Sequence, residues 1–290
     1  MSHHGKKQTA PTPWPAPSPV SGATPWPSPS PVSGATPWPN PSPVSVATPT
    51  PPVPAFQILT VCTGNICRSP MAEIMLRHAL RDIPGIGLAS AGTNALVGHP
   101  MPPEARAVLE GLSLTDEPPH VAQQLTTDLV QRSDLILALT REHRRRVVQL
   151  DPSATRRVFT LREFAYVAGH VTEADLAEAA ADLAWRDEVE GLPPTPQHPG
   201  RAAVGAVFAV NGVFPWPDPT ELDVADPFGQ PLVAYAEAAA RMLPAVEALA
   251  EFFAHLPGLG SPASPSGVTA SWGQQSPSTS SEALVGLSSR

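Results

Sequence analysis

Short apolar runs alternate with amphipathic segments between residues 56 and 256. The run FQILTV at 56–61 is rich enough in branched apolar residues for a strand buried on both faces. Three more runs of this kind follow, at 86–90 (IGLAS), 134–139 (DLILAL) and 156–161 (RRVFTL). Because helical patterns separate these runs, the chain is predicted to be an α/β protein. We expect a three-layer fold, in which helices flank an open, four-stranded parallel sheet.

Helices are predicted where apolar residues recur at intervals of three and four. The first starts at Ser69, whose hydroxyl can cap free amides, and runs to about Arg81. Others are expected at 102–111, at 141–150, from Thr172 to Glu190, and from 231 to 256, where Pro244 marks a kink or break. The run AAVGAVFAVNGVF at 202–214 fits no single pattern.

The two ends of the chain lack this alternation. The first 55 residues hold 17 of the 39 prolines, and an approximate 12-residue unit (PWPAPSPVSGAT) recurs three times. Residues 1–54 are therefore predicted to be a disordered, proline-rich arm, and the Gly-, Ser- and Pro-rich residues 257–290 a disordered tail. The arm is either a ligand for polyproline-binding grooves, anchored by Trp14, Trp26 and Trp38, or an extension without a specific partner.

Composition narrows the class of the remaining domain, residues 55–256. A net charge of −8 argues against a general nucleic-acid binder, and no apolar run reaches the length of a membrane span. Two cysteines do not make a disulfide scaffold, and the nine histidines lack paired metal-ligand spacing. The prediction is a cytoplasmic protein without a metal. The basic cluster REHRRR at 141–146 is expected to be a solvated helix face.

Both cysteines lie in one loop, in the stretch VCTGNICRSPMAE at 61–73. A loop from a strand into a helix directs successive amides inward, so it can bind a tetrahedral oxyanion that Arg68 grips with a planar fork. The same field stabilises a thiolate at Cys62. Gly64 would allow the tight turn, Asn65 a left-handed conformation, and Ser69 a hydrogen bond to the thiolate. This pattern predicts thiolate attack on a phosphoryl group, the alternative being an ordinary connection with two buried cysteines.

The loop resembles the signature of the low-molecular-weight protein tyrosine phosphatases. The resemblance extends to SAGT at 90–93, HVAQQLT at 120–126 and DPFG at 226–229, and covers about 56–165 and 222–256. It implies a nucleophile at Cys62 and phosphate binding by Arg68, with no cofactor. It also implies a phosphate-binding loop that includes Thr63, Gly64, Asn65, Ile66, Cys67 and Ser69. A supporting hydrogen-bond network would join Asn65 and Ser69 to Ser90 and His120.

A phosphatase also needs an acid that protonates the leaving group. Three Asp-Pro pairs compete for this role. Asp151 lies in the loop before the fourth strand and is typical of a turn, and Asp218 lacks an aromatic-glycine continuation. Asp226, in DPFG just before the last helix, matches the position of the family's acid, so it is the predicted proton donor.

The chain departs from the family pattern at several positions. In the acid loop, Phe228 stands alone where tyrosines that line the cleft are usual. Leu96 occupies a wall position that is often aromatic, and Gln123 replaces a more usual arginine. Related arginine phosphatases typically carry threonine at the position of Ile66, which favours phosphotyrosine as the substrate. Residues 166–221 form an insert relative to the compact family body. This insert either covers the cleft or is a surface excursion.

The predicted function is hydrolysis of phosphotyrosine in proteins, opposite a tyrosine kinase, through a cysteinyl-phosphate intermediate. One alternative is a thiol-dependent arsenate reductase on the same fold, although the chain has no cysteine outside the loop. Another is a phosphate-binding or scaffold protein that acts through its proline-rich arm. Cys67 is predicted to form a protective disulfide with an oxidised Cys62, the alternative being that it only packs behind the loop.

Overall fold

A computed structural model of the chain describes residues 56–115, 118–191, 198–214 and 218–259. All of them belong to one unit, Pro52–Arg290. The predicted arm at 1–54 lies outside the described residues, and so does the predicted tail beyond residue 259.

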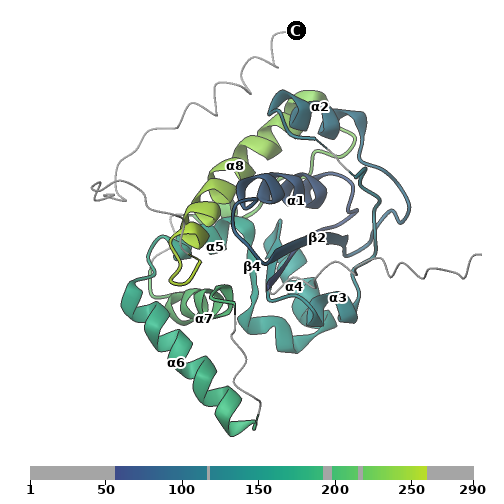
Figure 1. Cartoon of the computed structure of the whole chain (residues 1–290). Helices are drawn as coiled ribbons and strands as arrows, with labels where there is room; N and C mark the ends of the chain where they lie inside the picture. The colour runs from purple at the N-terminus through teal and green to yellow at the C-terminus, as the bar shows by residue number, and fades with distance from the viewer. Residues whose placement is uncertain (1–55, 116–117, 192–197, 215–217, 260–290) are drawn as a thin grey trace, which may run out of the picture. The chain divides into compact units, whose positions relative to one another are not determined.

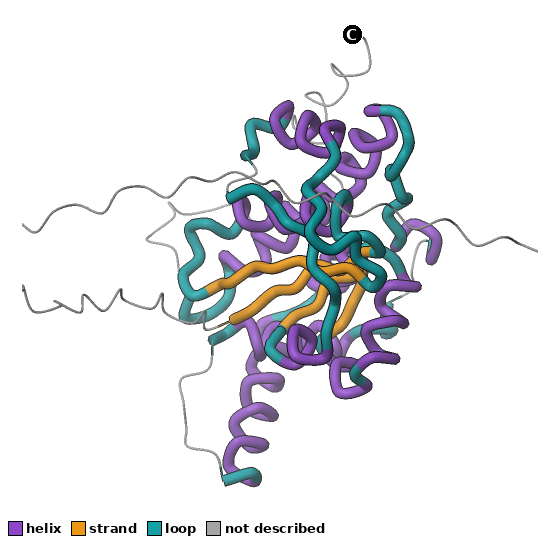
Figure 2. The backbone as a smooth tube through the Cα atoms, turned by 90° about the vertical axis from the view of Figure 1, so that its right-hand side faces the viewer, coloured by secondary structure: helices purple, strands orange, loops and turns teal. Residues whose placement is uncertain are grey.

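Four strands form one parallel sheet, as predicted. They are β1 (Phe56–Cys62), β2 (Ile86–Gly92), β3 (Leu135–Ala138) and β4 (Val158–Thr160), in the order β2-β1-β3-β4. Cys62 pairs with Gly92 across β1 and β2, and Val61 pairs with Ala138 across β1 and β3. The carboxyl ends of these strands are therefore level, and the loops that follow them meet at one edge of the sheet (Figure 2).

Helices cover both faces of the sheet, so the predicted three layers are confirmed. Alternate strand residues enter two separate cores: Ile58 and Leu137 enter one, Leu59 and Ile136 the other. The first core is covered by α1 (Arg68–Ala79), α2 (Pro103–Gly111), α5 (Leu161–Ala168) and α8 (Leu232–Ala254). The second is covered by α3 (Thr127–Gln131) and α4 (Arg141–Leu150) (Figure 1).

Some element boundaries differ from the prediction. Helix α1 begins at Arg68, and no side chain caps its start at Cys67; the expected cap, Ser69, bonds within the loop instead. Helix α8 continues through Pro244, which does not break it. The short α3 and the whole of α5 were not predicted, nor were the two 3-10 helices η1 (Pro152–Arg156) and η2 (Pro219–Leu222).

The insert supplies two helices, α6 (Glu173–Val189) and α7 (Gly200–Val210), the second within the run that the sequence pattern left unassigned. His198, just before α7, stacks on Phe56 at the start of β1, with ring centroids 5.1 Å apart. Arg201 pairs with Asp134, which precedes β3, at 2.8 Å. These contacts lie at the amino ends of the strands, whereas Cys62 lies at a carboxyl end. Helix α6 thus lies on the surface, whereas α7 packs into the core with Ala203, Val204 and Val207, and neither helix covers the cysteine loop.

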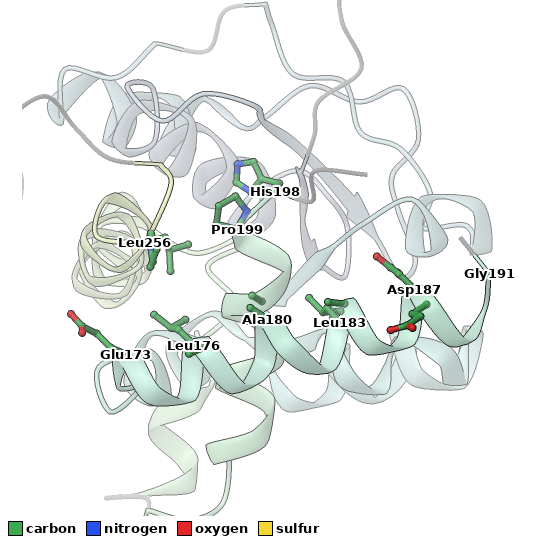
Figure 3. Close-up of a pocket in the computed structure, with 14 residues that line it drawn as sticks. Glu173, Leu176, Ala180, Leu183, Asp187, Gly191, His198, Pro199 and Leu256 are labelled. Atoms are coloured by element: carbon green, nitrogen blue, oxygen red, sulfur yellow. The ribbon is translucent and has the colours of Figure 1, made fainter. Parts of the chain in front are cut away.

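Helix α6 contributes no buried residue, although a capping box at Thr172 and Asp175 fixes its start. Its apolar side, with Leu176, Ala180 and Leu183, borders a cavity of about 920 Å³ that His198, Pro199 and Leu256 close from the other side (Figure 3). Because His198 also stacks on the start of β1, this cavity lies at the amino edge of the sheet, remote from the cysteine loop.

Candidate active site

The backbone of the cysteine loop is held from outside. Four successive carbonyl oxygens, those of residues 62 to 65, each accept a hydrogen bond from a group beyond the loop. The donors are, in order, the amides of Thr93, Asn94 and Leu96 and Nε2 of His120, at 2.9, 3.0, 3.0 and 2.6 Å. In a planar trans peptide the next N–H points opposite to the carbonyl, so the N–H groups of residues 63–66 face the inside of the loop. The Asn65 amide does so, 3.3 Å from Sγ of Cys62.

The tight turn is made by Asn65, not by Gly64. Asn65 has φ 54°, in the left-handed region, whereas Gly64 lies outside that region and has room for a Cβ, with Ile66 Cγ1 at 3.5 Å. The assignment of the turn to Gly64 was therefore wrong. The Asn65 side chain stabilises the turn: Nδ2 donates to the hydroxyls of Ser69 and Ser90 at 2.9 Å each, and Oδ1 accepts from the Gln123 amide at 2.8 Å.

Ser69 connects this network to the thiol. Its Oγ lies 3.0 Å from Sγ of Cys62, and both residues are buried. Asn65 Nδ2 already donates to the Ser69 oxygen, so Ser69 can direct its hydroxyl proton to the sulfur at 3.0 Å or to the Ala91 carbonyl, which is farther away at 3.5 Å. A thiolate at Cys62 would thus accept hydrogen bonds from Ser69 and from the Asn65 amide, next to the uncapped start of α1.

Arg68 links the cysteine loop to the loop before α8. Arg68 is 4 % exposed; its Nη1 donates to the Val224 carbonyl at 3.1 Å, and its Nη2 pairs with Asp226 Oδ2 at 2.6 Å. Nε is buried and has no hydrogen-bond partner within the described part of the chain. Val224 is in turn held by its amide, which donates to the Leu139 carbonyl after β3 at 2.9 Å. An oxyanion in the loop would supply the acceptor that Nε lacks.

The other two candidate acids serve as helix caps. Asp151 accepts from the Ser153 amide at 2.9 Å at the start of η1, and Asp218 accepts from the Thr220 amide at 2.8 Å at the start of η2. Hydrogen bonds from Ser153 and Thr220 lower the pKa of each carboxyl below its ordinary value. Neither carboxyl contacts the cysteine loop in the described part of the chain, whereas the half-exposed Asp226 contacts Arg68.

Three residues of the site were missed in the sequence. Gly92 is one, because a Cβ there would lie 2.5 Å from the Thr63 carbonyl oxygen. Val224 is the second. The third is His143: the REHRRR segment is mostly exposed, as predicted, but His143 is only 4 % exposed and its Nε2 lies 2.8 Å from Thr63 Oγ1. Gly92, in SAGT, and Val224, two positions before DPFG, could have been found from their places beside these motifs. Nothing in the sequence distinguished His143.

Cys67 points away from the inside of the loop. Its Sγ lies 4.0 Å from the Tyr235 hydroxyl on α8, and burial raises the pKa of the thiol to about 12. Both cysteines are free thiols. A disulfide with Cys62 stays a prediction, and it requires Cys67 to lose both its proton and its packing.

The two apolar residues predicted to line the cleft are exposed and adjoin the site. Leu96 is 41 % exposed, and its amide donates to the Gly64 carbonyl. Phe228 is 56 % exposed, and its amide donates to Asp226 Oδ1 at 3.2 Å. Ile66, in contrast, is buried within the loop.

In the described part of the chain no helix is long and apolar enough to cross a membrane. Nor do any three His, Cys, Asp or Glu residues among those described group together as metal ligands.

Comparison with known proteins identifies the relatives of this site. The family described as "Low molecular weight phosphotyrosine protein phosphatase" matches residues 57–179. The probable low molecular weight protein-tyrosine-phosphatase EpsP of Ralstonia solanacearum is 47 % identical over 108 residues, 37 % of this chain and 70 % of that protein. The chain belongs to the low molecular weight phosphotyrosine protein phosphatase family.

The chain is also similar to proteins named as arginine phosphatases. The protein-arginine-phosphatase of Geobacillus stearothermophilus is 35 % identical over 142 residues, 47 % of this chain and 90 % of that protein. Among solved structures, the tyrosine phosphatase AmsI of Erwinia amylovora is 25 % identical, with a TM-score of 0.44 over 66 % of this chain and 89 % of that one.

Proposed function

We propose that the chain hydrolyses phosphotyrosine in proteins through a cysteinyl-phosphate intermediate on Cys62. The observation that carries the proposal is the arrangement of three groups. A buried thiol lies among inward-facing amides, Arg68 offers an unpartnered Nε beside it, and Asp226 adjoins the same guanidinium. Phosphate binding alone would need the amides and Arg68, but neither a nucleophile nor an acid.

In the first half of the reaction, the phosphoryl group lies among the loop amides and Nε of Arg68. The Cys62 thiolate attacks phosphorus, an S–P bond forms, and the P–O bond to tyrosine breaks. Asp226 gives its proton to the departing phenolate oxygen. The phosphoryl oxygens compete with Asp226 for Arg68, which releases the carboxyl to face the leaving group.

In the second half, water attacks phosphorus and gives a proton to the Asp226 carboxylate. The S–P bond breaks, which releases inorganic phosphate and restores the thiolate. The Ser69 hydroxyl and the Asn65 amide stabilise the sulfur as a leaving group, because both lie within hydrogen-bond distance of it.

Phosphotyrosine is favoured over phosphoarginine by the rim of the site. Leu96 and Phe228 offer exposed apolar surface on segments that bond to the loop and to Asp226, and a phenyl ring can pack there. At position 66 the chain has isoleucine, whereas threonine is the residue expected in the related arginine phosphatases, so this position also favours phosphotyrosine. Since relatives of both names match the chain, phosphoarginine is the substrate against which this proposal is tested.

The partners proposed on this basis are phosphoproteins and the tyrosine kinase that opposes the enzyme. A partner that binds polyproline is proposed for the arm at 1–54, whose repeats carry Trp14, Trp26 and Trp38. The proposed compartment is the cytoplasm, because a thiolate mechanism needs Cys62 reduced.

The test is a substrate panel with the purified full chain: a phosphotyrosine peptide, phosphoarginine, and arsenate with a thiol reductant. We expect kcat/KM for phosphotyrosine to exceed that for phosphoarginine by at least about tenfold, roughly the contribution of one well-packed aromatic contact. Faster turnover of phosphoarginine, or arsenate reduction without phosphatase activity, would refute the proposal.

The nucleophile is tested by Cys62→Ser. Turnover should vanish, because a serine hydroxyl is not ionised at neutral pH, while inorganic phosphate should still bind through the amides and Arg68. Stopped assays measure the first and isothermal calorimetry the second. Residual phosphatase activity near the wild-type level would exclude a cysteinyl-phosphate.

A further inference from the structure

We propose that His143 is a positioning residue for the phosphate-binding loop: it fixes Thr63, next to the nucleophile, from the α4 side. This inference rests on the proposed function and deepens it. His143 does not touch the reacting atoms; it acts through Thr63.

The imidazole is held at both of its nitrogens. Nδ1 lies 2.9 Å from Oγ1 of Thr140, the residue that caps α4, and Nε2 lies 2.8 Å from Oγ1 of Thr63. Because the ring is also buried, it cannot rotate without breaking two hydrogen bonds. The Thr63 hydroxyl is thereby fixed, although Thr63 itself is exposed.

The contact spans the crevice between β1 and β3. These strands are neighbours in the sheet, and the strand order changes direction between them, which is where open α/β sheets bind ligands. The phosphate-binding loop leaves β1, and α4 follows β3. The His143–Thr63 hydrogen bond joins these two segments directly, in addition to the link that runs from Arg68 through Val224 to Leu139.

Thr63 is consequently held from two sides. Its carbonyl oxygen accepts from the Asn94 amide on the β2 side at 3.0 Å, and its hydroxyl bonds to His143 on the β3 side. By comparison, the described contacts anchor Gly64 from outside through its carbonyl, by Leu96, whereas Asn65 is held both through its carbonyl, by His120, and through its side chain, by Ser90 and Gln123. Loss of His143 would leave the first residue after Cys62 anchored on one side only.

The charge state suits this role. Burial, and next the positive charge of Arg68, lower the pKa of His143 to about 4, against the opposing effect of Asp226, Asp223 and Glu142. The ring is therefore neutral at neutral pH and has one donor and one acceptor, which match the two threonine hydroxyls in either tautomer.

Two substitutions separate positioning from simple packing. In His143→Gln the amide reaches about as far as Nε2, so the bond to Thr63 can form while the bond to Thr140 is lost. In His143→Asn the amide reaches about as far as Nδ1, so the bond to Thr140 can form while Thr63 is released. Thr63→Val removes the hydroxyl at nearly constant volume on an exposed residue, where folding should be unaffected.

The measurements are kcat and KM for para-nitrophenyl phosphate, the affinity for inorganic phosphate by calorimetry, and the melting temperature. We expect His143→Asn and Thr63→Val each to lower kcat/KM about five- to tenfold, the usual effect of one hydrogen bond, with weaker phosphate binding. His143→Gln should stay within about threefold of wild type. The double variant His143→Asn/Thr63→Val should lose no more than His143→Asn alone, because both remove the same bond.

The inference would be overturned if Thr63→Val had the same kcat/KM and the same phosphate affinity as the wild type. Additive losses in the double variant, or equal losses in the Gln and Asn variants at equal stability, would also overturn it. If His143→Asn does not fold, Thr63→Val and His143→Gln still decide the matter. An inactive wild-type chain would refute the proposed function instead, and phosphate affinity across the variants would still test the positioning role.

Discussion

Two aspartates that each precede a proline, Asp218 and Asp226, make different contacts. Asp226 pairs with Arg68, whereas Asp218 caps η2. We predict that Asp226→Ala lowers kcat by about 10²–10⁴ on phenyl phosphates with poor leaving groups, the usual range for positioned proton transfer. The loss should shrink for leaving groups that depart without a proton, which a series of substituted phenyl phosphates measures.

Asp218→Ala is the matched control for this acid. It removes a carboxylate from another Asp-Pro pair, so it should lower stability slightly and leave kcat unchanged. A larger loss of kcat in Asp218→Ala than in Asp226→Ala would mean that Asp226 is not the acid and that Asp218 takes its place.

His143 also makes stability depend on pH. Its pKa is about 4 in the folded chain and about 6.5 when unfolded, so above pH 6.5 the ring is neutral in both states and contributes nothing. As pH falls from 6.5 to 4, only the unfolded chain binds the proton, and the free energy of unfolding drops by up to roughly 3 kcal/mol. Urea denaturation of wild type and His143→Gln at several pH values isolates this term. Parallel curves for the two proteins would contradict it.

At the residue scale, the sequence predicted the groups within the loop better than the groups that hold it. Cys62, Asn65, Arg68 and Ser69 share a short segment whose spacing has chemical meaning. The partners His143 and Val224 are 81 and 162 positions from Cys62 by residue number, and only the sheet order brings them near. For Val224 the visible signal was an apolar residue two positions before DPFG, and for His143 the sequence carries no signal, because a histidine in an arginine-rich helix is ordinarily exposed.

At the element scale, the strand that ends at Gly92 matters as much as the loop that it supports. Residues 93, 94 and 96 anchor three loop carbonyls, and they can do so only because β2 approaches the Thr63 carbonyl closely at Gly92. We predict that Gly92→Ala lowers the free energy of unfolding by about 1–3 kcal/mol, the usual cost of overpacking, and also lowers kcat/KM. Chemical denaturation and steady-state kinetics measure the two effects.

Gly205→Ala is the control for Gly92→Ala. Gly205 lies within α7, where a Cβ would meet Ala179 Cβ at 3.5 Å, an ordinary contact. Alanine favours a helix over glycine by up to about 1 kcal/mol, so this variant should be neutral or more stable, with unchanged kinetics. If Gly205→Ala lowered the free energy of unfolding and kcat/KM as much as Gly92→Ala, the close approach of β2 to the Thr63 carbonyl would not explain the losses in Gly92→Ala.

Most helices and strands were predictable because apolar residues recur at different intervals in the two. Two of the helices that were not predicted, α5 and α7, were missed for physical reasons. Helix α5 begins directly after β4, and Thr160 both ends the strand and caps the helix, so one apolar pattern runs into the next. Helix α7 is rich in Ala, Gly and Val with apolar residues on several sides, which suits a strand as well as a buried helix. Its identity is decided by packing on α6 and on Phe56, at positions distant in sequence.

At the scale of the whole domain, the proposed reaction and the helices α6 and α7 of the insert lie at opposite ends of the strands. The phosphate-binding loop and Asp226 lie at the carboxyl ends of the strands, whereas His198 and α7 lie at the amino ends. Substitutions on the apolar side of α6 are thus separated from the reaction by the length of the strands.

This separation predicts that a shortened chain of residues 55–259 retains kcat/KM on a phosphotyrosine peptide within about twofold, because each group proposed to act in catalysis lies between residues 60 and 235. The end at 259 keeps Leu256 and Leu259, which pack against the core, and so extends the predicted boundary at 256. Chains of residues 55–290 and 1–259 show which end is responsible for any difference. A many-fold loss in 55–259 and 55–290 but not in 1–259 would mean that the proline-rich arm binds the catalytic domain, in which case the arm would act on the reaction itself and not only on outside partners.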